Sequence, residues 1–286
     1  MIITKLKGGL GNQMFQYATG LCLAQKNKDK LLLDISGYHD ERVINSDTPR
    51  QYRLDNFNVS SEIATNIQIQ KVKNKFRILS KILRYIDQKY INNYYKDYHP
   101  NIFNKKGDVY LEGYFQSEKN FEKIREQLQK EFSLKNEISN NQLIEEIKSC
   151  QSVCIHIRRG DYIKDEKTNK VHGTCTIEYY KNAIKYITEK TDNPIFYFFS
   201  DEISWVKENF PIDNISMKIG TDNKHEDYEE LTIMSYCKHN IIANSSFSWW
   251  SAWMNQNPDK IVIAPLKWTN IANDHRNILP ETWIRI

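Results

Sequence analysis

The chain has 286 residues, of which 40% are hydrophobic and 27% are charged, and its formal net charge is +4. Such a composition is typical of a folded globular protein and excludes an intrinsically disordered chain, which would contain fewer apolar residues. The mild positive charge suits an anionic ligand but falls short of the dense basic surface of nucleic-acid-binding proteins, so we expect no nucleic-acid partner. A chain of this length suits two domains of moderate size.

The five cysteines are odd in number and include no C-x-x-C pair, so neither a disulfide framework nor a zinc ribbon is indicated. We expect reduced thiols and a cytoplasmic protein. The sequence contains no apolar run of about 18 residues and no signal-peptide pattern, which predicts a protein without a membrane anchor of its own.

The first elements in chain order are a predicted strand at 2–6, a glycine-rich turn at 7–13 and an amphipathic helix. The start of such a helix can hold an anion or let a ligand approach closely, and a tight turn without a ligand is an equally good interpretation. A dinucleotide fingerprint would need a third glycine where Met14 stands, although Asp34 lies where a ribose-binding acid would fall. A nicotinamide-dependent oxidoreductase therefore remains an alternative.

Residues 66–98 depart from the rest in composition, with basic and apolar residues interleaved and several tyrosines following. The pattern predicts a basic amphipathic helix that leads into a tyrosine-rich loop. The favoured interpretation is a solvated helix face on a packed core. The alternative is peripheral contact of residues 71–98 with an anionic membrane surface or a lipid-linked acceptor.

A polar stretch at 133–142 places a domain boundary at about residue 145. Beyond the boundary, short apolar segments alternate with helical patterns, which predicts a parallel sheet covered by helices on both faces. The predicted strands lie near residues 152–157, 194–199, 217–220, 240–243 and 261–264.

The stretch 152–162, reading SVCIHIRRGDY, is the most informative of these segments. Its apolar residues alternate with Cys154, His156 and Arg158, so we expect one oily face and a second face that ends in cations. The pattern breaks at Gly160, where the backbone is free to turn. The stretch therefore predicts a buried strand with an anion site at its tip.

Polar side chains end three of the predicted strands, where ligands of parallel sheets bind. Arg158 suits a diphosphate, since its guanidinium donates hydrogen bonds in pairs. Ser245 and Ser246 at a helix start suit the same phosphates, and Asp201 suits a base or a ribose. Each has a structural alternative, because strand-end arginines often form salt bridges and such acids and serines often cap helices. The convergence of three strand ends favours a nucleotide site.

Four longer motifs carry a resemblance to a known family: GGLGNQMFQYA at 8–18, HIRRGDY at 156–162, FSDE at 199–202 and IIANSSFSWWSAWMN at 241–255. In their order and spacing, the chain resembles the bacterial α-1,2-fucosyltransferases of glycosyltransferase family 11. The resemblance implies an α/β fold of the GT-B type, in which two Rossmann-like domains with parallel sheets face each other across a cleft.

The resemblance also implies what each domain does. Residues 1–145 would form a mainly acceptor-side domain and residues 146–286 a GDP-fucose-binding domain, with the last residues packing back on the first. The implied reaction is inverting transfer of L-fucose from GDP-β-L-fucose to the 2-hydroxyl of a galactose-type residue in a surface glycan. The enzyme would be cytoplasmic, or peripheral at the inner membrane.

The chemistry of that reaction assigns roles within the motifs. The sequence contains no D-x-D signature of metal-dependent glycosyltransferases, so we expect no metal cofactor, with Arg158 at the β-phosphate and His156 beside it. A base must take the acceptor proton. Asp161 is one candidate base, although pairing with Arg159 is at least as good an interpretation, and Glu118 is a second. Further residues assigned by resemblance are Gly9, Gly11, Asn12, Gln13 and Phe247 for the donor and Gln116 and Glu118 for the acceptor.

A noncatalytic carbohydrate-binding protein is the remaining alternative, and it rests on the aromatic content. Trp249, Trp250 and Trp253 would then stack on sugars, but their helical spacing favours a core position. His172 follows the HIRRGDY motif, and only this location recommends it.

Overall fold

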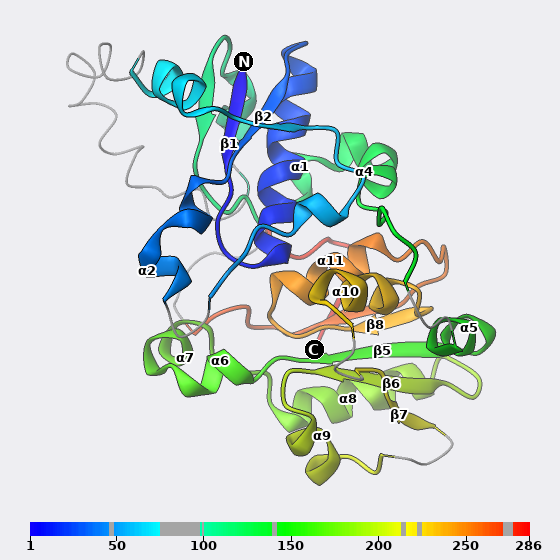
Figure 1. Cartoon of the computed structure of the whole chain (residues 1–286). Coiled ribbons are helices and arrows are strands. Elements are labelled where there is room, and N and C mark those ends of the chain that lie inside the picture. Colours follow the sequence, from blue (N-terminus) through cyan, green and yellow to red (C-terminus); the bar gives the residue numbers. More distant parts are fainter. Residues whose placement is uncertain are drawn as a thin grey trace. The chain divides into compact units, whose positions relative to one another are not determined.

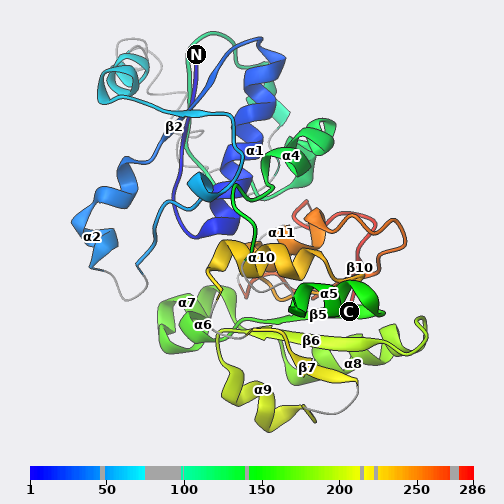
Figure 2. The ribbon, with the colours of Figure 1, turned by 45° about the vertical axis from the view of Figure 1, so that its right-hand side comes forward.

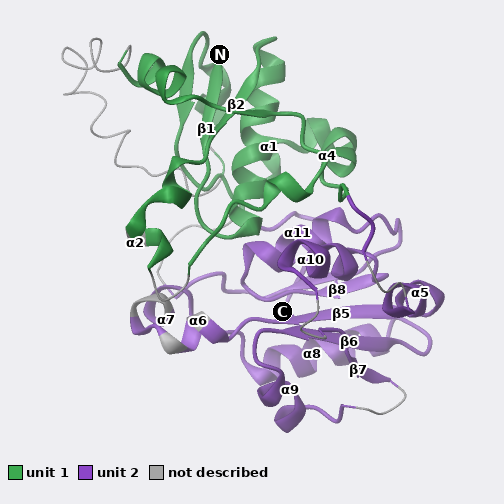
Figure 3. Cartoon of the chain, in the orientation of Figure 1, with its two compact units in different colours: residues 1–135, 276–278 green, residues 136–275, 279–286 purple. Residues whose placement is uncertain are grey.

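The chain divides into two compact units in a computed structural model that describes residues 1–45, 49–74, 98, 100–138, 142–212, 216–221, 225–270 and 277–286. Unit 1 comprises residues 1–135 and 276–278, and unit 2 comprises residues 136–275 and 279–286 (Figure 3). The division lies before the boundary predicted near residue 145, because helix α5 (Gln142–Ser149) packs on the sheet of unit 2 through its buried isoleucines.

Unit 1 is built on a parallel sheet with the strand order β3-β2-β1-β4 in its described residues (Figure 1). The strands are β1 (Ile2–Lys5), β2 (Leu31–Asp34), β3 (Glu62–Ile63) and β4 (Val109–Leu111). All neighbouring strands pair in parallel. Almost every residue of β1 and β2 is buried, which explains why both read as apolar runs rather than as alternating patterns.

Helix α1 (Leu10–Lys26) follows β1 after a two-glycine turn. Gly8 has a φ of +80°, a conformation that favours glycine, and Gly9 is the extended residue that precedes the helix. The predicted turn at 7–13 was therefore too long, because Gly11 and the two residues after it already lie in the first helical turn. The predicted strand–turn–helix unit is otherwise confirmed.

The segment of unit 1 after β4 consists of short helices. The 3-10 turns η4 (Glu118–Asn120) and η5 (Glu122–Ile124) precede helix α4 (Arg125–Glu131). Phe121 interrupts the helical conformation with φ −151°, ψ 8°. The remaining short elements of this unit are η1 (Ser36–His39), α2 (Glu41–Ile44), η2 (Leu54–Asn56) and η3 (Pro100–Asn104).

The basic segment predicted at 66–98 is described only in part. Residues 66–74 are helical, and Val72 is fully buried, as expected for a helix that packs one face on a core. Residues 75–97 and 99 lie outside the described residues, and the predicted tyrosine-rich loop and membrane contact lie mostly there. No helix among the described residues is long and apolar enough to span a membrane.

Unit 2 contains a parallel sheet with the strand order β10-β9-β8-β5-β6-β7. The strands are β5 (Ser152–Ile157), β6 (Ile195–Ser200), β7 (Met217–Ile219), β8 (His239–Ile241), β9 (Val262–Ala264) and β10 (Ile284–Arg285). The first five confirm the strands predicted from the sequence, and β10 was not predicted. Two parallel sheets with helices between their strands confirm the α/β class.

Helices cover both faces of this second sheet (Figure 2). Helices α8 (Ile177–Thr188) and α9 (Ile203–Asn209) lie on one side, and α10 (Asp227–Ser235) and α11 (Ser246–Met254) lie on the other. The connection after β5 forms two further helices, α6 (Gly160–Lys164) and α7 (Glu166–His172).

Strand β5 is buried on both of its faces, which confirms the predicted buried strand. Val153, Ile155 and Ile157 pack into the core beneath α8 and α9, as their alternation predicts. Cys154 and His156 point to the other face and are buried as well. The cationic character begins only after the strand ends, because a central parallel strand has helices on both sides.

Helix α11 places its tryptophans in the core of unit 2. Trp249, Trp250 and Trp253 are fully buried, and their rings contact one another at centroid distances of 5.1 to 6.2 Å. The core interpretation of these residues is confirmed, and the sugar-stacking interpretation is wrong. The five cysteines are free thiols.

Candidate functional site

The tip of β5 carries an ion pair between the two residues predicted to bind the donor nucleotide. Arg158 Nη1 lies 2.9 Å from Asp201 Oδ2, and both side chains are about three-quarters buried. The sheet register explains the pairing. Ile157 of β5 lies opposite Ser200 of β6, so the residues that follow these two strands emerge side by side. The structural alternative considered for Arg158, a salt bridge, is therefore present.

Asp201 also fixes the backbone at the start of α6. Its Oδ1 accepts a hydrogen bond from the backbone N–H of Arg159 at 3.0 Å. A Cβ atom added to Gly160 would lie 2.9 Å from Asp201 Oδ2, closer than real Cβ atoms approach their neighbours. Gly160 is thus required for the close approach of this carboxylate, and its φ is not in the left-handed region. The carboxylate positions Arg158 rather than simply capping α9.

Arg159 has different partners from Arg158. Its Nε lies 2.8 Å from Glu202 Oε2, and its Cζ lies 4.2 Å from the centre of the Trp205 ring. Glu202 comes from the segment that follows β6, and the pairing of Arg159 with Asp161 stays a prediction, since the Asp161 side chain is outside the described structure. Stacking on an aromatic face together with an ion pair is a common arrangement for a structural arginine.

Asp161, the first candidate base, has its backbone in α6. Its side chain lies outside what the structure describes, so its candidacy stays a prediction.

His156 is a buried, neutral histidine beside the ion pair. Its side chain is 4% exposed, and its ring lies 5.5 Å from the ring of Phe247. Burial lowers the pKa of His156 to about 3, against a smaller raising effect of the Asp201 carboxylate, and the charge of Arg158 adds a still smaller lowering. Its Nδ1 makes no hydrogen bond to any described residue. A buried ring nitrogen without a partner is uncommon, and it leaves this side chain able to bind a ligand atom.

The start of α11 presents the third predicted cluster. Ser245 is the N-cap, and its hydroxyl accepts a hydrogen bond from the backbone N–H of Phe247 at 3.3 Å. Ser246 and Phe247 are half-buried at the first turn. Capping by Ser245 is therefore structural, and it is compatible with an anion at the same helix start, since several N–H groups remain there.

In unit 1, the predicted donor residue Gln13 is fully buried and holds the backbone together. Its Nε2 donates to Gly8 O at 3.1 Å and to Gln51 O at 2.8 Å, and its Oε1 accepts from Arg53 N at 2.9 Å. With the amide engaged on both sides, the geometry favours a structural role for Gln13. Its contribution is to fix the glycine turn against residues 51–53.

Asn12 and Gln116, which were assigned to donor and acceptor, contact each other. Gln116 Nε2 donates to Asn12 Oδ1 at 2.8 Å, and Asn12 is half-buried. Gly9 and Gly11 lie at the same helix start. Glu118 is the first residue of η4 and is half-buried. Burial lowers the pKa of Arg125, and the negative charge of Glu118 partly offsets this by raising it. These residues thus gather around the start of α1 and the segment after β4.

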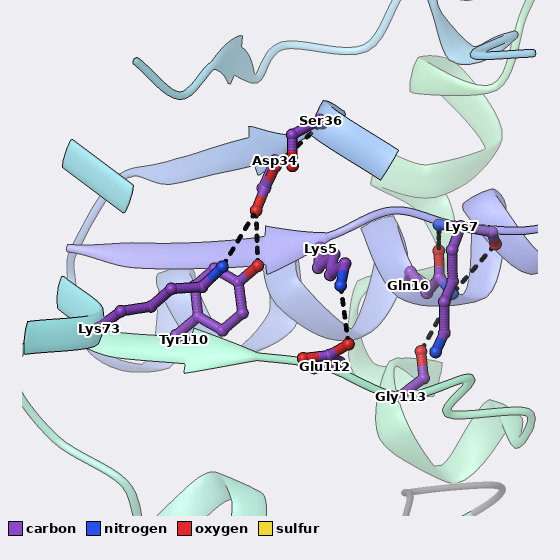
Figure 4. A network of polar contacts seen from close by, with 9 residues as sticks. All are labelled: Lys5, Lys7, Gln16, Asp34, Ser36, Lys73, Tyr110, Glu112 and Gly113. Atoms are coloured by element: carbon purple, nitrogen blue, oxygen red, sulfur yellow. Dashed lines mark hydrogen bonds and ion pairs between the residues drawn. The ribbon is translucent and has the colours of Figure 1, made fainter. Parts of the chain in front are cut away.

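A polar network occupies the carboxyl ends of β1, β2 and β4, and Figure 4 shows its members. Asp34 accepts hydrogen bonds from Tyr110 Oη at 2.5 Å and from Ser36 N at 2.9 Å, with Lys73 Nζ at 3.8 Å. Burial alone would raise the pKa of Asp34, but these partners lower it below its ordinary value. Because the carboxylate is fully buried and so engaged, it is poorly placed to read a ribose, and the dinucleotide interpretation loses its main residue.

No group of three or more His, Cys, Asp or Glu side chains in the described ranges could hold a metal ion. The residues that sequence reasoning missed are Tyr162 and Glu202. Tyr162 was inside a quoted motif, and Glu202 was inside a predicted cluster, but neither had an assigned contact. The register of β5 against β6 is the signal that would have found Glu202.

Comparison with known proteins decides between the alternatives. The family model described as glycosyl transferase family 11 matches residues 1–286. The chain belongs to this family. The resemblance carried by the four motifs is thereby confirmed, and the nicotinamide-dependent oxidoreductase is set aside.

Three relatives illustrate the range of the family. The chain is 34% identical to an alpha-1,2-colitosyltransferase of Escherichia coli, over 100% of this chain and 99% of the relative. It is 33% identical to the O-antigen biosynthesis glycosyltransferase WbnK of Escherichia coli, over 98% and 99% of the two chains. A galactoside alpha-(1,2)-fucosyltransferase 1 of Saimiri boliviensis boliviensis is 22% identical over 86% of this chain and 63% of the relative.

Proposed function

We propose that the protein transfers L-fucose from GDP-β-L-fucose to the 2-hydroxyl of a galactose-type residue, with inversion and without a metal ion. Membership of glycosyl transferase family 11 supports glycosyl transfer, and the names of two of the relatives support an α-1,2 linkage. The observation that carries the proposal is the ion pair of Arg158 and Asp201 beside the buried, neutral His156 at the carboxyl ends of adjacent strands. A surface polysaccharide acceptor is supported by the name of WbnK.

The proposed chemistry is a single displacement. The bond between fucose C1 and the β-phosphate oxygen breaks, and its electron pair stays on the diphosphate. The guanidinium of Arg158 stabilises this charge, because it is held in advance where the charge develops and needs no reorganisation. The galactose 2-hydroxyl attacks C1 from the opposite face and loses its proton to a base.

His156 would contribute a hydrogen bond and not a charge. Because its pKa is about 3, the imidazole is neutral at physiological pH. A neutral imidazole donates one hydrogen bond and accepts another. We assign it to an oxygen of the diphosphate beside Arg158, since its Nδ1 is buried without a described partner.

The catalytic base is proposed from two carboxylates. Asp161 follows the arginines in the motif, and Glu118 is half-buried next to Gln116 in unit 1. Two substitutions test which carboxylate is the base: Asp161→Asn and Glu118→Gln. The variant of the true base loses kcat on the order of 100- to 10,000-fold with little change in GDP affinity, and a variant that keeps wild-type kcat removes its residue from candidacy.

GDP-colitose is a second candidate donor, which is favoured by the 34% identity to the colitosyltransferase. Colitose differs from fucose by lacking the 3-hydroxyl. A site built to hydrogen-bond that hydroxyl rejects the analogue on the order of 10,000-fold, whereas a site without such a group discriminates far less. The ratio of kcat/KM for the two donors therefore identifies the natural one.

The test is incubation with either donor and a panel of galactose-terminated acceptors in EDTA, followed by linkage and anomeric analysis by NMR. We expect an α-1,2 product at full rate. Arg158→Ala should lose about 100- to 1,000-fold in kcat, and the control Arg159→Ala should lose less, because Arg159 contacts Glu202 and Trp205. A strict metal requirement, a retained anomeric configuration or near-normal turnover of Arg158→Ala would refute the mechanism.

A further inference from the structure

Tyr162, which has no assigned role, contacts the guanidinium of Arg158. The Cζ atom of Arg158 lies 5.8 Å from the centre of the Tyr162 ring, within the range of a cation–π contact. Tyr162 is half-buried and lies in α6, one turn after the end of β5. Arg158 is therefore contacted by a carboxylate from β6 and by an aromatic ring from the connection that follows its own strand.

A second ring supports Tyr162. His172, the last residue of α7, stacks on Tyr162 with a centroid distance of 5.1 Å and an angle of 19° between the ring planes. The Tyr162 ring thus lies between the guanidinium of Arg158 and the imidazole of His172 in a chain of contacts. We call these three residues the Arg158 stack. Parallel rings at this distance restrict the tilt of Tyr162.

Asparagines hold the backbone of both ring-bearing residues. Asn169 Nδ2 donates to Tyr162 O at 2.7 Å, and Asn244 Nδ2 donates to His172 O at 2.9 Å. Tyr162 Oη also donates to Asn244 O at 3.4 Å. Since Asn244 directly precedes the N-cap of α11, the rings are tied to the same strand ends that carry the proposed donor site. The stack can therefore impose an orientation on Arg158 and not merely follow it.

An arginine side chain is long and flexible, so contacts that restrict its conformations help to fix the position of its guanidinium. Asp201 contacts it through Nη1, whereas an aromatic face restrains the plane of the whole guanidinium. A guanidinium carries five N–H donors, more than the contact with Asp201 uses. Holding its plane before the donor arrives avoids the ordering cost that a free side chain would incur on binding.

We propose that Tyr162, backed by His172, is a positioning residue that orients the guanidinium of Arg158 toward the β-phosphate of the donor. The proposal rests on the proposed function. In this proposal Tyr162 does not touch the substrate itself, because it acts by orienting Arg158.

The test compares the affinities of the full-length protein for GDP and GMP by calorimetry, because only GDP has the β-phosphate. Tyr162→Leu should weaken GDP binding about three- to tenfold and leave GMP binding unchanged. Tyr162→Phe keeps the ring and should stay within about twofold of wild type for both nucleotides. His172→Leu should act in the same direction as Tyr162→Leu with a smaller effect.

Two further variants make the outcomes decisive. In an Arg158→Lys background, Tyr162→Leu should cost nothing more, because the planar guanidinium is already absent. Arg158→Ala should abolish the preference for GDP over GMP; if it does not, the proposed phosphate contact fails. If Arg158→Ala abolishes the preference for GDP but Tyr162→Leu leaves the affinity for GDP unchanged, the phosphate contact holds and only the positioning role of Tyr162 is wrong. Equal weakening of GDP and GMP by Tyr162→Leu, or a change confined to acceptor KM, also overturns it.

Discussion

Gly160→Ala tests the arrangement at the tip of β5 with the smallest possible change. The added Cβ would lie 2.9 Å from Asp201 Oδ2 and 3.2 Å from its Cγ, whereas ordinary contacts of a Cβ begin at 3.4 Å. The carboxylate must therefore move by about 0.5 Å. The displaced oxygen is the one that pairs with Arg158 Nη1 at 2.9 Å. A comparable lengthening takes this contact out of the usual range of a charge-assisted hydrogen bond.

The expected loss of activity follows from this displacement. Misplacement of a catalytic group by 1 Å can cost on the order of 100-fold in rate, so a shift of half that size should cost about tenfold, or about 1.4 kcal/mol of transition-state stabilisation. Stability should hardly fall, because the φ of Gly160 is not in the left-handed region and alanine favours the helix that begins there.

The assay is steady-state transfer from the better donor, combined with thermal unfolding. The matched control is Gly37→Ala in unit 1, whose Cβ would meet only Leu6 O at 3.8 Å, and we expect wild-type rate and melting temperature for it. Wild-type activity of Gly160→Ala would refute the reasoning, since it would show that the Asp201 position does not matter for turnover. Unfolding of the variant would equally refute the claim of a small local shift.

Two further outcomes concern a buried histidine and a buried acid. Burial lowers the pKa of His156 from its ordinary 6.5 to about 3. Between these two pH values, His156 is protonated in the unfolded chain and neutral in the folded protein. Its stabilising contribution is complete above pH 6.5 and is lost as the pH falls, by about 2 kcal/mol between pH 6.5 and pH 5. Urea unfolding should show this loss in wild type and a smaller one in His156→Gln, and equal losses would contradict the assignment. Tyr110→Phe removes a hydrogen bond to the buried Asp34 and should destabilise the protein by about 1 to 3 kcal/mol in the same assay. Turnover of this variant at low temperature should be normal, and a specific loss of kcat would instead indicate a catalytic network.

The glutamines of the GGLGNQMFQYA motif show that one motif can contain residues with different roles. Gln13 and Gln16 are both fully buried and bind backbone groups of the loops around the glycine turn. Gln13 was assigned to the donor by the family resemblance alone. Two of its three hydrogen-bond partners, Gln51 and Arg53, lie far along the chain, and no local pattern indicates them.

The sequence by itself determined the elements that depend on local patterns. The alternation in β5, the apolar runs of β6 and β9 and the serine at the start of α11 all predicted their structures, because burial and helix capping involve residues close in the chain. The motifs with their order and spacing also identified the family.

Only the tertiary structure decided which acidic side chains pair with the two arginines that follow β5. No local pattern indicated that the parallel register of β5 and β6 would pair Arg158 with Asp201 and Arg159 with Glu202. Both acids lie more than 40 residues further on, and strand order in a sheet follows from how helices pack and not from any local pattern. The same packing, through α6 and α7, brings an aromatic stack to Arg158.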